Sequence, residues 1–185
     1  MSHATLALTS PVCTVRTFHL EDAPTLARHG NDRRIWLNLR DRFPHPYHEA
    51  DARAYLTHLA TQPTATSFAI DVGGEAVGGI SLHPGTDVER IGAEIGYWLG
   101  AEHWGAGIAT AAVRLLTAHA LGPMGFERVF ALPFTRNVAS ARVLEKAGYV
   151  REGTLRRSAI KDGIVLDQHL YAIVREAGGA ESVRA

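Results

Sequence analysis

The stretch "AEIGYWLGAEHWGAGIATAAVRLL", residues 93–116, joins a predicted strand to a predicted helix through two closely spaced glycines. Gly105 and Gly107 lack a Cβ, so an anion can approach their backbone closely. The start of the helix would offer free N–H groups and a partial positive charge, and both attract phosphate. The stretch has neither the Gly-Lys-Ser/Thr of a P-loop nor the third glycine of a dinucleotide-binding fingerprint. Taken alone, it fits a phosphate site and a tightly packed turn equally well.

Length and composition predict one ordinary globular domain. The chain has 185 residues, 46% hydrophobic and 21% charged, which suits a single substantial core. We expect the domain to span residues 10–176, with tails at 1–9 and 177–185. Basic and acidic residues both number 19, so the net charge of zero gives no reason to expect nucleic acid or an acidic membrane as a partner. No apolar run is long enough for a bilayer and the N-terminus does not read as a secretory signal, so we expect a cytoplasmic location.

Cysteine and histidine usage gives no metal-site signature. Cys13 is the one cysteine in these 185 residues, so an intrachain disulfide and a site built from several cysteines are excluded. The ten histidines are scattered, and the pair His45 and His48 in a proline-rich loop is too weak a pattern to indicate a ligand set. We predict no metal.

The hydrophobic periodicity changes several times along the chain. Helices are predicted at 21–32, 48–62, 107–121 and 137–148, with a short helix or turn at 33–40, and strands at 13–20, 66–72, 76–84, 88–100, 127–134 and 163–175. This order predicts an α/β (α+β) fold, with a mixed, mostly antiparallel sheet of six to seven strands flanked by helices. The helix 107–121 connects two strands by a crossover, and these two strands should be parallel.

Several ordered blocks together resemble the GNAT superfamily of N-acetyltransferases, and more narrowly the branch of ribosomal-protein N-terminal (RimJ/RimL-type) acetyltransferases. The first block is "EIGYWL" at 94–99 followed by Trp-Gly-x-Gly-x-Ala-Thr at 104–110. The others are "FPHPYHEADARAYL" at 43–56, "NVASARVLEKAGYVREGTLR" at 137–156 and "KDGIVLDQHLYAI" at 161–173. The resemblance covers nearly the whole chain. It implies the GNAT acyl-CoA N-acyltransferase fold and acetyl-CoA as the acyl donor.

The resemblance also implies where acetyl-CoA binds. The strand over 94–99 would splay from its parallel neighbour, so that pantetheine pairs with the free backbone edge and an amide near 97–99 points at the thioester carbonyl. The expected cofactor-binding residues are Tyr97, Trp98, Leu99, Trp104, Gly105, Ala106, Gly107, Ile108, Ala109, Thr110, Asn137, Ser140 and Lys146. The family usually has Lys or Arg at position 106 and often Glu at 111, where this chain has alanine. We therefore expect backbone amides of 105–110, and not a side chain, to hold the pyrophosphate.

Acyl transfer from a thioester to an amine needs a proton acceptor for the amine and donors for the oxyanion of the tetrahedral intermediate. Glu94 is the candidate base, because the resemblance places it on the central strand beside the thioester. The alternative is a structural acid bonded to a neighbouring element. Strand alternation puts Glu94 and Trp98 on one face of the sheet and Tyr97 on the other.

The leaving thiolate also prefers a proton donor. Ser140 lies one helical turn after Asn137, so their side chains share a face, and the resemblance puts both beside the CoA arm. Ser140 is the candidate donor to sulfur, although a water relay, plain hydrogen bonding or a helix-surface position would also fit. Tyr149 and Tyr171 are alternative acids or core residues.

We interpret the chain as an acetyl-CoA-dependent N-acetyltransferase that moves the acetyl group directly to a primary amine in a ternary complex. Trp36, Phe43 and Tyr47 are expected to line the acceptor pocket, or else to be buried structural aromatics. A protein N-terminus of the ribosomal-protein type is one acceptor. A small-molecule amine such as an antibiotic, polyamine or amino acid, a larger acyl group such as succinyl, and a CoA-binding regulatory module with little turnover stay open. A homodimer is expected from the family alone.

Overall fold

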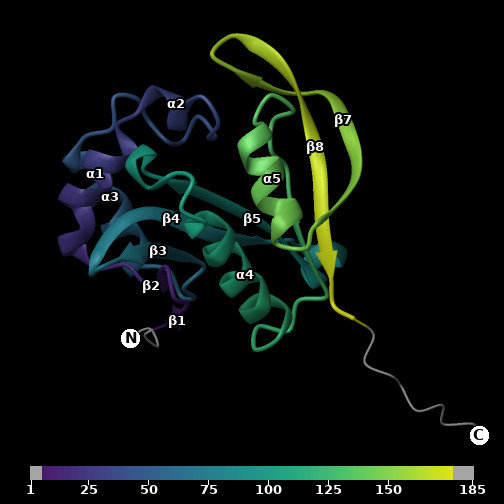
Figure 1. Cartoon of the computed structure of the whole chain (residues 1–185), viewed down its shortest axis with the longest axis horizontal. Coiled ribbons are helices and arrows are strands. Elements are labelled where there is room, and N and C mark those ends of the chain that lie inside the picture. The colour runs from purple at the N-terminus through teal and green to yellow at the C-terminus, as the bar shows by residue number, and fades with distance from the viewer. Residues whose placement is uncertain (1–5, 177–185) are drawn as a thin grey trace, which may run out of the picture.

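One eight-stranded sheet runs through the molecule, with its strands in the order β1-β2-β3-β4-β5-β6-β8-β7 (Figure 1). The structure is a computed structural model, and it describes residues 6–176. The strands are β1 (Ala7–Thr9), β2 (Thr14–Thr17), β3 (Ser67–Val72), β4 (Glu75–Pro84), β5 (Gly92–Leu99), β6 (Arg128–Ala131), β7 (Val150–Lys161) and β8 (Ile164–Val174). All neighbouring strands are antiparallel except β5 and β6, which are parallel as the crossover predicts.

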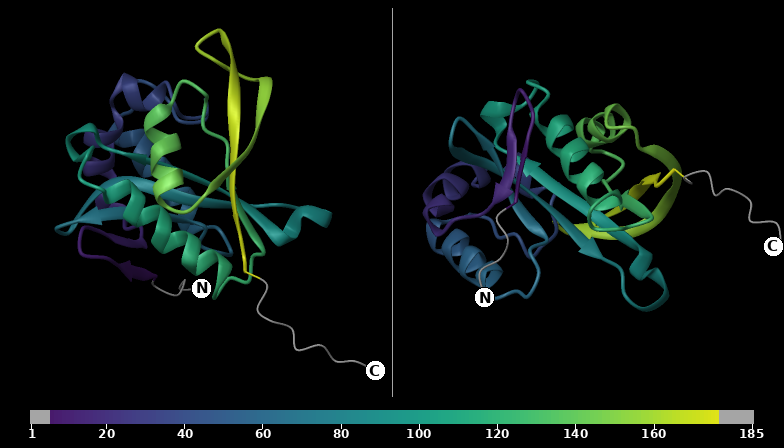
Figure 2. Two further views of the ribbon diagram at one scale, coloured as in Figure 1. Left: turned by 45° about the vertical axis from the view of Figure 1, so that its right-hand side comes forward. Right: turned by 90° about the horizontal axis from the view of Figure 1, so that it is seen from below.

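Helices cover both faces of this sheet (Figure 2). They are η1 (Leu20–Asp22), α1 (Ala23–Gly30), α2 (Arg33–Trp36), α3 (Glu49–Ala60), η2 (Asp87–Ile91), η3 (Ala101–His103), α4 (Ile108–Leu121) and α5 (Val138–Lys146). Helices α4 and α5 pack on one face around the larger core, while α1 and α3 pack on the other around a smaller one. Within residues 6–176, none of these helices combines the length and the apolar character that a membrane span requires.

Helix α4 illustrates how the pattern of residues sets the packing. Ile108, Ala112, Leu116 and Ala120 recur every four residues and are buried, so the helix presents one apolar stripe to the sheet. Gly107 caps its start with φ +78°, a left-handed conformation that glycine adopts without steric cost. The helix therefore begins at a fixed point beside the end of β5.

The predicted fold class is confirmed, and the number of strands is larger than expected. Strand β7 was missed because its register shifts between Arg151 and Gly153 and again between Leu155 and Ala159, which breaks the alternation of side chains. Strand β1 lies inside the stretch 1–9 that was expected to be a tail, and it pairs with β2 at the edge of the sheet. The other expected tail, 177–185, lies outside the described residues.

The start of the strand predicted at 88–100 also differs. Residues Asp87–Ile91 form the 3-10 helix η2, and β5 begins only at Gly92. Asp87 has φ +52°, a left-handed conformation that cannot continue a strand. The remaining boundaries of the predicted helices and strands move by a few residues at most.

Side-chain contacts join the segment around α2 to the turn of the β7–β8 hairpin. Lys161 donates to Asp41 at 2.8 Å, its ammonium lies 3.9 Å from the centre of the Trp36 ring, and its side chain is only 1% exposed. Arg33 pairs with Asp162 at 2.6 Å. Segments more than a hundred residues apart are thus joined over the end of the sheet.

Candidate acyl-CoA site

The second half of β5 has an edge without a strand partner. Within the described residues, β5 pairs with β6 only from Gly92 to Glu94, whereas it pairs with β4 as far as Leu99. Figure 1 shows α5 lying between β5 and the β7–β8 hairpin, where the sheet opens. The backbone from Ile95 to Leu99 can therefore offer hydrogen bonds to a ligand on that side.

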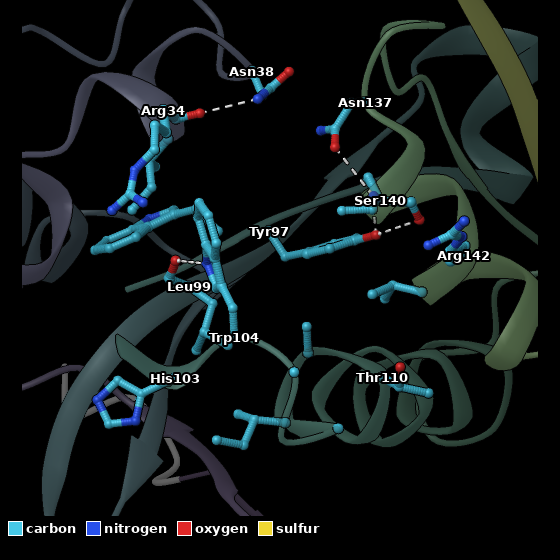
Figure 3. A pocket seen from close by; sticks show the side chains of 18 of the residues that line it. Arg34, Asn38, Tyr97, Leu99, His103, Trp104, Thr110, Asn137, Ser140 and Arg142 are labelled. Atoms are coloured by element: carbon cyan, nitrogen blue, oxygen red, sulfur yellow. Dashed lines mark hydrogen bonds between the residues drawn. The ribbon is translucent and has the colours of Figure 1, made fainter. Parts of the chain in front are cut away.

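A cavity of about 510 Å³ occupies this opening (Figure 3). Residues of β5, of the loop into α4, of α5 and of α2 line it. It contains every predicted cofactor-binding residue except Ala106, namely Tyr97, Trp98, Leu99, Trp104, Gly105, Gly107, Ile108, Ala109, Thr110, Asn137, Ser140 and Lys146. The structure therefore brings together residues that lie in two separate blocks of the sequence.

The loop into α4 forms an open backbone cradle. Gly105 and Gly107 have φ +81° and +78°, and a Cβ built on either would meet no atom within 4 Å. The indole N–H of Trp104 donates to the carbonyl oxygen of Leu99 at 2.7 Å, which fixes the loop to the end of β5. A phosphate group would thus find free N–H groups at the start of α4 with no side chain in front of them.

Two hydroxyl groups meet at the wall of this cavity. The Tyr97 hydroxyl lies 2.8 Å from Ser140 Oγ and 3.2 Å from the Ser140 carbonyl oxygen. Burial raises the pKa of Tyr97 above its ordinary value, against a smaller lowering effect of the Ser140 hydrogen bond, so the phenol stays neutral. Asn137 caps α5 by accepting from the Ser140 backbone N–H at 3.1 Å.

Three cations face the cavity, and of these the sequence predicted only Lys146. Arg142 and Lys146 line it from α5, and Arg34 lines it from α2, where its guanidinium lies 5.2 Å from the Trp104 ring centre. The spacing of four between Arg142 and Lys146 is the signal that could have found Arg142, because it puts both on one helix face. The expectation that backbone amides of 105–110 hold the pyrophosphate stays a prediction.

Other lining residues were missed because nothing near them in the sequence marks them. Asn38 and Leu39 follow α2, and the Asn38 amide donates to the Arg34 carbonyl at 3.0 Å. The segment that carries them is held by the Lys161–Asp41 pair and by Arg136, which donates to the Leu37 carbonyl at 2.7 Å.

Glu94 does not line the cavity. Its carboxylate forms an ion pair with Arg40, and its register partner on β4 is His83. Burial lowers the pKa of His83, and the charge of Arg42 lowers it further, so this imidazole is neutral near pH 7. The role of Glu94 as a base stays a prediction.

The strand alternation predicted for β5 is present in the structure. Tyr97 packs on the face that carries α4 and α5, whereas Trp98 packs with the cluster under α1 and α3. The register from Gly78↔Leu99 to Pro84↔Ala93 runs without a bulge.

The three aromatics expected around an acceptor do not line this cavity. Phe43 stacks on Tyr47 with ring centres 4.3 Å apart, and Tyr47 is 4% exposed. Phe43 also meets the Trp98 ring edge-on at 5.6 Å, and Trp36 packs against Lys161 and His45. Tyr47 is buried, whereas Trp36 and Phe43 are half-buried, and a role of the three aromatics at an acceptor pocket stays a prediction.

The two alternative tyrosine acids are also engaged elsewhere. The Tyr149 hydroxyl lies 2.7 Å from Thr117 Oγ1 in the core, and Tyr171 donates to Glu145 at 2.8 Å. Neither lines the cavity.

One group of metal-ligating side chains comes together among the described residues, although the sequence predicted none. Ligand atoms of His29, Glu102 and His103 lie within 4.8 Å of one another. His29 Nε2 is 2.6 Å from Glu75 Oε1 and 3.0 Å from Arg28 Nη2. The Glu75 carboxylate, which also pairs with Arg28, thus occupies one ring nitrogen of His29. The absence of a metal stays a prediction.

Comparisons with known proteins agree with this geometry. A family model described as "Acetyltransferase (GNAT) domain" matches residues 13–150. The chain belongs to the GNAT acetyltransferase family. GNAT proteins of known structure share its architecture: Mycobacterium smegmatis RimJ in complex with CoA-disulfide superposes with a TM-score of 0.80 at 26% identity, covering 95% of this chain and 89% of that one.

Two relatives from Bacillus subtilis (strain 168) are similar in sequence. They are "Uncharacterized N-acetyltransferase YoaA" and "Putative ribosomal N-acetyltransferase YdaF", each 36% identical over 101 and 102 residues respectively. Each match covers 55% of this chain, and it spans 56% of YoaA and 55% of YdaF. The likeness to these two relatives therefore concerns about half of their length.

Proposed function

We propose that this GNAT protein is an acetyl-CoA-dependent N-acetyltransferase that transfers the acetyl group directly to a primary amine. The observation that carries the proposal is the cavity along the unpaired edge of β5, with the start of α4 at its wall. An extended pantetheine arm can pair with a free strand edge, and a pyrophosphate suits a helix N-terminus. Both features occur in one cavity of this chain.

The residues present fit acetyl-CoA. Gly105 and Gly107 leave their backbone open, and side chains at those positions would fill the cradle. Arg142 and Lys146 can pair with phosphate oxygens from the facing helix. Asn137 lies at the cavity wall, where its amide could bond the pantetheine chain.

Acetyl-CoA supplies the activated acyl thioester, and the chain supplies position and hydrogen bonds. A backbone amide on the open edge of β5 near Tyr97–Leu99 would stabilise the developing oxyanion. Ser140, at the cavity wall, would face the sulfur, and Glu94 is the proposed proton acceptor for the amine, with its carboxylate oriented by Arg40. Direct transfer of this kind needs no covalent enzyme nucleophile.

We propose a protein N-terminus as the acceptor. Support comes from YdaF, a relative at 36% identity over about half of this chain, which is named a putative ribosomal N-acetyltransferase. The acceptor would approach from the side of α2, where Asn38 and Leu39 line the cavity. Soluble peptides are therefore the first acceptors to test.

A thiol-release assay with acetyl-CoA tests the proposal. Two short peptides of the same lysine-containing sequence are compared. One has a free α-amine, and in the other the α-amine is acetylated so that only the lysine amine is free. We expect thiol release with the first peptide and little with the second. Small amines such as polyamines and amino acids form the next arm, and release with these alone would overturn the proposed acceptor while keeping the reaction. If acetyl-CoA raises the melting temperature but no amine gives free thiol, the chain is a CoA-binding module and the proposed enzyme is contradicted.

A further inference from the structure

Two hydroxyl groups from distant parts of the chain share a hydrogen bond at the cavity wall (Figure 3). Tyr97 comes from β5 and Ser140 from the first turn of α5, and their oxygens are 2.8 Å apart. Among the described residues, Tyr97 is the one hydrogen-bond partner of the Ser140 hydroxyl. The position of the serine is set by its backbone, which donates to Asn137 Oδ1 at 3.1 Å.

Each hydroxyl has one hydrogen, so two arrangements are available. In the first, Tyr97 donates to Ser140 Oγ and leaves the serine hydrogen free to point into the cavity. In the second, Tyr97 donates to the Ser140 carbonyl oxygen at 3.2 Å, and the serine hydrogen is used on the tyrosine. A negatively charged acceptor in the cavity selects the first arrangement, because both hydrogens then lie in one chain that points toward the charge.

We propose that Tyr97 is a positioning residue that turns the Ser140 hydroxyl toward the sulfur of the leaving thiol. The inference rests on the proposed function, which places that sulfur in this cavity. It concerns the side chain of Tyr97, whereas the sequence implicated position 97 only through the backbone edge of β5. Tyr97 acts through Ser140 and need not touch the substrate itself.

The protonation state of Tyr97 suits this role. Its pKa is raised by burial, so the phenol is a neutral donor and not an anion that would repel a thiolate. When the amine attacks, a carbon–nitrogen bond forms, the carbon–sulfur bond breaks, and its electron pair stays on sulfur. Ser140 donates a hydrogen bond to that thiolate and Tyr97 donates to Ser140, while the proton lost by the amine goes to the base. No net proton moves between the two hydroxyl groups.

The test is Tyr97→Phe, which removes only the hydroxyl, measured beside Ser140→Ala and the double variant. With the acceptor found by thiol release, we expect kcat to fall on the order of tenfold for Tyr97→Phe, the loss of a hydrogen bond to a charged network, with KM for acetyl-CoA unchanged. When Ser140 is already alanine, adding Tyr97→Phe should lower kcat no further, because Tyr97 acts through Ser140. Additive losses would overturn the inference.

Tyr149→Phe is the matched control. It removes the hydroxyl of another buried, hydrogen-bonded tyrosine, which bonds Thr117 outside the cavity. We expect it to change stability but leave kcat and KM near those of the wild type. An equal fall in kcat for both variants would show a general packing effect and contradict the role of Tyr97.

A binding measurement separates this inference from the proposed function. As pH rises through the thiol's ordinary pKa of about 8.5, the wild type should bind CoA progressively more tightly than desulfo-CoA, which has no thiol. Tyr97→Phe should bind desulfo-CoA normally and lose this gain. If both ligands bind and the gain is the same in the two proteins, this inference alone is wrong. If neither ligand binds the wild type, the proposed function is wrong and this inference falls with it.

Discussion

Gly107 shows at the scale of one residue how backbone conformation makes a binding surface. Its φ of +78° allows the chain to turn from η3 into α4, and the space where its side chain would lie is empty. From the sequence, the pair of glycines predicts a phosphate cradle only when the blocks at 94–99 and 137–156 are considered with it. Arg34 could not be predicted, because an arginine in a short helix carries no local mark of the cavity that it lines, whereas the spacing of Arg142 from Lys146 on one helix face was a usable signal.

A pair of alanine substitutions separates strain from binding. Gly107→Ala and Gly73→Ala both force alanine into positive φ, at +78° and +64°, with no atom near the new methyl group. We expect each to cost roughly 1–2 kcal/mol of stability, because the left-handed region is unfavourable for alanine. Only Gly107→Ala should also weaken acetyl-CoA binding, by about tenfold or more, because its methyl group fills the cradle.

Calorimetric titration of acetyl-CoA into both variants measures this difference, and urea denaturation measures the strain. Equal affinities for Gly107→Ala and Gly73→Ala would show that the start of α4 does not hold the phosphates.

At the scale of elements, helices and regularly alternating strands were predicted well. The apolar stripe of α4 defines a helix at 108–121 with little ambiguity. Strand β7 was not predicted, because its bulges break the period and most of its residues are exposed. The burial of Phe43 and Tyr47 was left open as well, since aromatic residues in a proline-rich loop suit a core and a ligand pocket equally.

Arg16 joins three of these elements, and the junction gives a pH prediction. From β2 it pairs with Asp22 of η1 through two hydrogen bonds of 2.8 Å and with Asp71 of β3 at 2.8 Å. Burial alone would raise the pKa of Asp22, but the bonds from Arg16 and the His19 backbone outweigh it and lower the pKa. This stabilisation is therefore complete above the ordinary Asp pKa of about 3.9 and is lost as pH falls through the lowered value.

Asp22→Asn should destabilise the protein by about 3 kcal/mol at pH 7, because it removes one partner of a largely buried ion pair. At pH 3, below the ordinary Asp pKa of about 3.9, the difference from wild type should be smaller, because Asp22 is then largely protonated in the unfolded chain. Urea denaturation at the two pH values measures this, with Glu21→Gln in the same 3-10 helix as the control that should change little. A difference that does not depend on pH would contradict the assignment.

At the scale of the whole molecule, the cavity exists because three segments far apart in the sequence converge. The residues after α2, the end of β5 with the start of α4, and α5 each supply part of its wall. The resemblance to GNAT proteins was needed to place 97–110 beside 137–146, because periodicity alone predicts the elements and not which of them meet. The contribution of α2 came only with the structure, where Lys161 and Asp41 fix that segment over the end of the sheet.

Amide hydrogen exchange with and without acetyl-CoA tests the central claim most directly. The first N–H groups of α4 have no partner within the helix, so they should exchange quickly in the free protein. Saturating acetyl-CoA should slow exchange at residues 105–110 and at the amides of 95–99 that face the open edge of β5. Binding without slower exchange at these positions, or with slower exchange only in the groove lined by Leu56 and Ser67 between α3 and β3, would contradict the account.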